Sequence, residues 1–83
     1  MNEPAAIRRA ADALEEAKGL LEELETDAIS VDGFKLRMAL LAGANPDIPE
    51  IQEAHDDPQG QSERLTDKLF ALRHTLYEQG LAE

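Results

Sequence analysis

The sequence contains no cysteine and no tryptophan, and its aromatic residues are limited to two Phe and one Tyr. Without cysteine, the chain can form neither a disulfide framework nor a thiolate zinc site. Its 83 residues must then rely on a small apolar core, since chains of this size bury only about 60 to 65% of the surface exposed on unfolding. We expect one helical domain, residues 1–83, of marginal stability unless a partner or second copy adds buried surface.

Long hydrophobic runs are also missing. The longest, such as MALLAGA at positions 38–44, are far too short to span a bilayer. The N-terminus is acidic and rich in alanine, and it lacks the basic start and continuous apolar block of a signal peptide. The sequence therefore favours a cytoplasmic protein that does not insert into membranes.

Basic residues are scarce: eight Lys and Arg stand against eighteen Asp and Glu, which gives a net charge of −10. A protein that neutralises phosphates needs a basic face, so direct nucleic-acid binding is disfavoured. The charge is compatible with simple solubility, with a basic protein partner, or with imitation of a nucleic acid's phosphate surface. These three interpretations remain open from composition alone.

Helix-forming residues dominate the chain, and no segment alternates apolar and polar residues in the manner of a strand. The predicted fold is all-α, a small four-helix arrangement with long first and last helices and two short central ones. The long pair should pack antiparallel or cross at a shallow angle.

The first helix is predicted to begin at the N-cap Asn2 and to reach about Asp27. Its apolar residues recur with a heptad period, which is typical of a helix that packs along its length against another helix. Acidic residues crowd its other sides and indicate a solvated face. The heptad residues are Ile7, Leu14 and Leu21, with Ala10, Ala17 and Leu24 between them; the acidic ones are Glu15, Glu16, Glu22, Glu23 and Glu25.

Ser30 is the predicted N-cap of the second helix, and Gly43 its terminator. Within this helix two apolar sets fall on different sides. Phe34, Met38 and Leu41 share one face, and Leu36 and Leu40 occupy a second.

A capping box formed by Asp47 and Glu50 predicts the start of the third helix, which should end near His55. Its buried side chains should be Ile48 and Ile51. The turn formers of HDDPQGQ predict a loop, after which Ser62 should cap a last helix from Glu63 to Gln79.

Parts of the sequence suggest three kinds of functional site: a helix-turn-helix, a metal site and a serine nucleophile. The second and third helices have the spacing of a helix-turn-helix, but the third carries acidic side chains where DNA readers carry basic or amide ones. His55, Asp56 and Asp57 are adjacent in a predicted loop, a poor geometry for ligating one metal ion. Ser30 and Ser62 are better explained as helix caps than as nucleophiles. No catalytic residue, metal ligand or cofactor motif is therefore predicted, and a small-molecule substrate is not expected.

The last helix carries two apolar stripes, although an amphipathic helix needs one. The second stripe lies about 100° around the helix from the first and is formed by Phe70, Tyr77 and Leu81, with His74 among them. Either the central helices cover it, which would make the last helix the hub of the bundle, or part of it stays available to a partner. The first stripe consists of Leu65, Leu69, Leu72 and Leu76.

These patterns favour a non-enzymatic protein-binding module, namely a small acidic adaptor, chaperone-like factor or inhibitor. Its predicted partner-binding residues are Phe70, His74, Tyr77 and Leu81. One alternative is an acidic decoy that imitates DNA and presents the glutamates of the first helix with Asp27 to a basic protein. The other is a homodimeric bundle built from the heptad stripe and the last helix.

Overall fold

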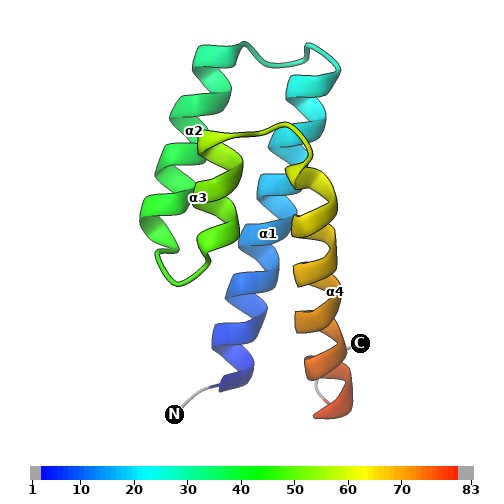
Figure 1. Cartoon of the computed structure of the whole chain (residues 1–83). Coiled ribbons are helices and arrows are strands. Elements are labelled where there is room, and N and C mark those ends of the chain that lie inside the picture. The colour runs from blue at the N-terminus through cyan, green and yellow to red at the C-terminus, as the bar shows by residue number, and fades with distance from the viewer. Residues whose placement is uncertain (1–2, 81–83) are drawn as a thin grey trace.

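The structure, a computed structural model, describes residues 3–80 and consists of four α-helices joined by short loops (Figure 1). Successive helices run in opposite directions, so that α1 and α4 lie antiparallel, and the start of α1 and the end of α4 are at the same end of the bundle (Figure 1). The all-α prediction is confirmed for the described residues, with long first and last helices and two shorter central ones. The bounds are α1 Glu3–Glu25, α2 Val31–Ala44, α3 Pro49–Asp56 and α4 Gln61–Glu78.

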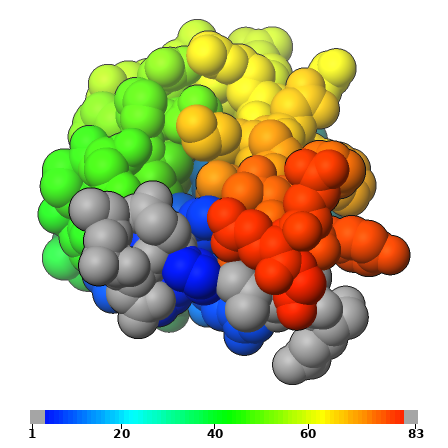
Figure 2. Space-filling view, turned by 90° about the horizontal axis from the view of Figure 1, so that it is seen from below, coloured from blue at the N-terminus to red at the C-terminus, as the bar shows by residue number. Residues whose placement is uncertain are grey.

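Helices α1 and α3 each contact the other three helices, and α1 packs most extensively, mainly along α4. Helices α2 and α4 do not contact each other, and α4 touches only α1 and α3. The alternative in which the last helix is the hub is therefore wrong. Viewed from the end that carries the termini, the last turns of α4 lie next to the first turn of α1 (Figure 2).

The buried side chains form one apolar cluster to which all four helices contribute. The predicted heptad stripe supplies much of it: Leu14 and Leu21 are buried, while Ile7 and Leu24 are half-buried. The small residues of α1 allow its neighbours to approach closely. The other cluster members include Ala13, Ala17 and Leu20 of α1, Phe34, Met38 and Ala42 of α2, Ile48, Ile51 and Ala54 around α3, and Leu65 and Leu69 of α4.

One of the three predicted side-chain caps is confirmed within the described residues. The Ser30 hydroxyl accepts a hydrogen bond from the Gly33 amide at 3.0 Å. Asp47 does not cap α3, since the N-cap is Ile48 and Pro49 at the first helical position already fixes a helical φ. Ser62 lies inside α4, which starts one residue after Gly60, whose φ of 81° turns the chain into the helix.

The helix ends also shift from their predicted places. Helix α1 ends at Glu25, and Asp27 follows in a left-handed conformation with a φ of 59°. The Ala28 amide then donates to the Glu23 carbonyl at 2.7 Å, the arrangement of a Schellman motif, in which the left-handed position is more often glycine.

The second helix continues past Gly43 to Ala44 and is followed by the C-cap Asn45, whose side-chain amide donates to the Leu41 carbonyl at 2.9 Å. Helix α3 reaches Asp56, one residue beyond the predicted end. Helix α4 ends at Glu78, before Gly80 with a φ of 72°. The predicted N-cap Asn2 lies outside the described residues.

We predict that Ser30→Ala lowers the free energy of unfolding by about 1 kcal/mol, because the Gly33 amide loses its acceptor. The matched change Ser62→Ala should leave it within about 0.5 kcal/mol, since Ser62 does not cap α4. Urea unfolding followed by circular dichroism measures both. Equal losses in the two variants would contradict the assignment of the caps.

Candidate functional site

The large exposed apolar side chains of α4 lie on the side predicted for partner binding. Phe70 is 64% exposed and Tyr77 73% exposed, so the bundle covers neither of them. His74 lies between them on the helix, and its side chain is also exposed. We call Phe70, His74 and Tyr77 the aromatic face; Leu81, the fourth predicted residue, lies outside the described residues.

Polar contacts with α3 show why the central helices do not cover this face. Lys68 approaches Glu50 of α3 with 3.8 Å between Nζ and Oε2, and Arg64 pairs with Glu53 of the same helix. Lys68 lies about 160° around α4 from Phe70, at 3.6 residues per turn. Helix α3 therefore packs on the far flank of α4 and leaves the aromatic face to solvent.

The other flank of α4 is bound to α1. Arg73 donates a hydrogen bond to Glu15 of α1, with 2.9 Å between Nη2 and Oε1. Of the first predicted stripe, Leu65, Leu69 and Leu76 are buried between these two flanks and Leu72 is half-buried there. All three basic side chains of α4 are thus engaged with neighbouring helices.

The aromatic face is bordered by acidic groups. Glu63 and Asp67 are exposed and form no ion pair within residues 3–80. Glu78 lies one turn after His74, with 3.6 Å between its Oε2 and the imidazole Nε2. A ligand of this face would therefore meet two aromatic rings, one imidazole and an acidic border.

A second exposed apolar patch lies on α2. Leu36 and Leu40 are 64% and 68% exposed, and Phe34 and Met38 are buried on the opposite side of the same helix. This confirms that the two apolar sets of α2 fall on different sides. Only the Phe34 and Met38 side belongs to the core.

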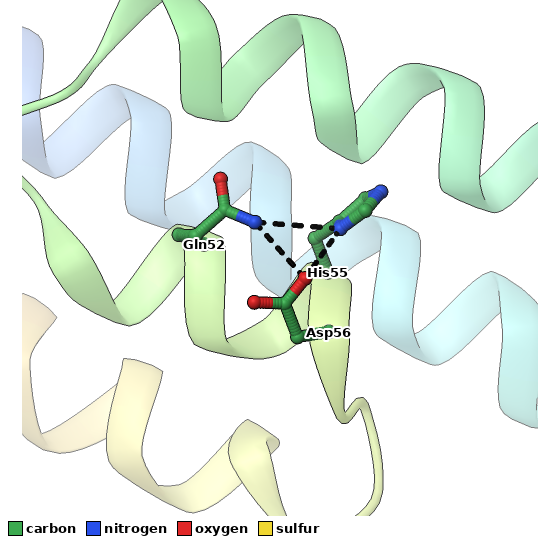
Figure 3. A network of polar contacts seen from close by, with 3 residues as sticks. All are labelled: Gln52, His55 and Asp56. Carbon is green, nitrogen blue, oxygen red and sulfur yellow. Dashed lines mark hydrogen bonds and ion pairs between the residues drawn. The ribbon is translucent and has the colours of Figure 1, made fainter.

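The cluster around His55 is helical and does not lie in a loop as expected. Figure 3 shows Gln52 and His55 converging on the Asp56 carboxylate in the last turns of α3. The His55 Nδ1 and the Gln52 Nε2 each lie 3.0 Å from Asp56 Oδ1. Hydrogen bonds from His55 and from Gln52, with the charge of His55, hold the pKa of Asp56 below its ordinary value.

Among the described residues, this cluster is not part of a larger group of metal-binding side chains. Within the described part of the chain, no group of three or more His, Asp or Glu side chains could hold a metal ion. An open hollow of about 480 Å³ lies where the end of α1 meets the loop before α4, and Leu21, Leu24, Pro58 and Gly60 form part of its wall. Its acidic groups, Glu25 and Glu63, have no basic or imidazole side chain beside them in the lining.

Among the described residues, no helix is both long and apolar enough to cross a membrane. Comparisons of this chain with family models, with curated proteins and with solved structures find no match.

We predict that His55→Ala raises the pKa of Asp56 toward its ordinary value, because the largest of its stabilising contacts is lost. The lowered pKa means that this contact contributes to stability above about pH 4, and that the contribution fades as the pH falls through the folded value. An NMR titration of the Asp56 carboxyl carbon measures the shift. His74→Ala should leave this titration unchanged, and an unchanged pKa in His55→Ala would contradict the contact.

Proposed function

We propose that this protein is a non-enzymatic protein-binding module whose aromatic face on α4 receives an amphipathic helix of a partner protein. The observation that carries the proposal is the exposure of Phe70 and Tyr77 in a chain that has only three aromatic residues. Exposed apolar patches with a polar border often mark the binding sites of soluble proteins. Phe and Tyr are enriched at the centres of protein interfaces, where each ring covers a large area at little entropic cost.

The spacing of the rings supports a helical occupant. Phe70 and Tyr77 are seven residues apart on α4, so they are separated by about 10 Å along one side of the helix. Two apolar side chains two turns apart on a partner helix would match that interval. His74 would contact the partner between them.

The acidic charge around the aromatic face indicates the charge expected on the partner helix. Glu63 and Asp67 border the aromatic face without an ion pair in the described residues, and the whole chain carries a net charge of −10. A partner helix with Lys or Arg beside its apolar residues would be steered toward this face and held in register. The partner is therefore expected to be a basic amphipathic helix.

We predict that Phe70→Ala with Tyr77→Ala lowers partner affinity by at least about 30-fold, the effect expected when central aromatic anchors are removed. Helicity should not change, because both side chains are exposed. The tagged protein is used to capture partners from cells that express it naturally, and the captured proteins are compared between wild type and variant.

The matched control is Val31→Ala, which removes an exposed apolar side chain from α2, 56% accessible in the folded chain. A partner of the aromatic face is retained by this control and lost by the α4 variant. Retention of every captured protein by the α4 variant would contradict the proposal.

The acidic decoy is the second candidate, and the surface of α1 gives it support. Glu16, Glu22 and Glu25 are exposed on α1 and form no ion pair in residues 3–80. Glu15 is different, because it is held by Arg73. A decoy would use the unpaired carboxylates in place of a phosphate backbone.

Salt dependence distinguishes these two modes of binding. For the aromatic face, we predict that affinity for a purified partner falls less than about tenfold between 50 and 200 mM NaCl, because burial of apolar surface is not screened. A decoy matched to a nucleic-acid site would lose about a thousandfold or more. A loss of that size, together with full binding by the α4 variant, would favour the decoy.

A further inference from the structure

The exposed side of α2 carries a continuous apolar stripe. Leu36, Ala39, Leu40 and Gly43 are all exposed and follow one another at i, i+3, i+4 and i+7, the spacing of a helix that packs against another helix. We call these four residues the α2 outer face. No helix of the described chain covers it, since α2 contacts only α1 and α3.

We propose that the α2 outer face binds the same face of a second copy of this chain, with the two α2 helices antiparallel. In an antiparallel pair, residues whose numbers add to a constant lie opposite each other. With the two-fold axis between Ala39 and Leu40, that constant is 79. Leu36 then meets the partner's Gly43, and Ala39 meets the partner's Leu40.

The sizes of these residues make the face its own complement. Each leucine of one copy faces a small residue of the other, so the leucines fit into the spaces beside Ala39 and Gly43 and the helices approach closely. A Cβ placed on Gly43 meets nothing within 4 Å, so the space over this residue is open in the monomer. Contact with solvent alone does not require leucines to alternate with small residues in this order.

Charge also favours α2 as the meeting place of two acidic chains. It is the one helix of the four with more basic than acidic residues, namely Lys35 and Arg37 against Asp32. Neither Lys35 nor Arg37 forms an ion pair within the described residues. Two copies that meet here avoid bringing the acidic surfaces of α1 and α3 together.

The antiparallel register keeps the like charges of α2 apart. Lys35 lies opposite position 44 of the partner helix, which is nine residues, or about 13 Å, from the partner's Lys35. Arg37 lies opposite position 42, which is about 7 Å along the helix from the partner's Arg37. Both side chains are exposed and long enough to turn toward water. Added salt should therefore strengthen the dimer by screening the net charge of −10 on each copy.

The size of the face sets the expected affinity. One face of a 14-residue helix is smaller than the roughly 800 Å² per partner of a stable interface. The dimer should be weak, with a Kd of about 10 μM to 1 mM. Because α2 and α4 do not touch, it would present two free aromatic faces, although the dimer itself does not depend on the function proposed for α4.

Sedimentation equilibrium of the full chain at several concentrations tests the proposal. Wild type should show a monomer–dimer equilibrium that tightens between 50 and 300 mM NaCl as charge repulsion is screened, by about threefold or more. Gly43→Leu should weaken dimerisation at least about tenfold, because the new side chain collides with the partner's Leu36. The monomer should stay folded, since the site is open and leucine is a better helix former.

A second variant distinguishes collision from general damage. Leu36→Ala with Gly43→Leu moves the large side chain to the other end of the stripe and restores the match, so its Kd should return to within about threefold of wild type. A wild type that stays monomeric at 1 mM, or a double variant no better than Gly43→Leu, would overturn the proposal. So would dimerisation lost in Phe70→Ala with Tyr77→Ala, or weakened by salt.

Discussion

The packing of α1 against the other three helices is the contact on which the rest of the structure depends. An 83-residue chain has enough apolar area for one small core, and that core forms around the buried stripe of Leu14, Ala17 and Leu21. Because α2 and α4 both pack on α1 without touching each other, each has an outward side that no other helix of the described residues can reach. The exposed apolar residues of α2 and α4 follow from this arrangement.

Buried leucines, flanked by polar contacts on both sides, set how α4 is turned about its own axis. Its three basic side chains reach α1 and α3, and its buried leucines lie between these contacts. Exposed ion pairs contribute little stability, typically less than about 1 kcal/mol each. The burial of Leu65, Leu69 and Leu76 therefore sets the orientation of α4, which leaves the aromatic face pointing away from the bundle. The aromatic face is thus a result of how α4 is held.

The sequence pattern predicted the helices and most of the core, because apolar periodicity reports which side of a helix is buried. Leu14, Ala17 and Leu21 of the heptad stripe, together with Phe34, Met38, Ile48 and Ile51, are core residues that this periodicity predicts. The sequence pattern predicts helix starts less well. The side chains of Asp47 and Ser62 fit capping rules, but neither caps its helix. Pro49 and Gly60 set the backbone conformation at these two helix starts instead. The exposure of Phe70 and Tyr77 remained one of two alternatives, since periodicity shows that a helix has two apolar sides and not which neighbours cover them.

The aromatic face of a single folded chain is open to water. Tyr77 is the only tyrosine, and the chain has no tryptophan, so intrinsic fluorescence reports on this one residue. Acrylamide, an uncharged quencher, should quench the fluorescence of the folded monomer nearly as strongly as that of free N-acetyltyrosinamide, in keeping with the 73% exposure of Tyr77. Fluorescence that is strongly protected from acrylamide in a folded monomer would contradict the account.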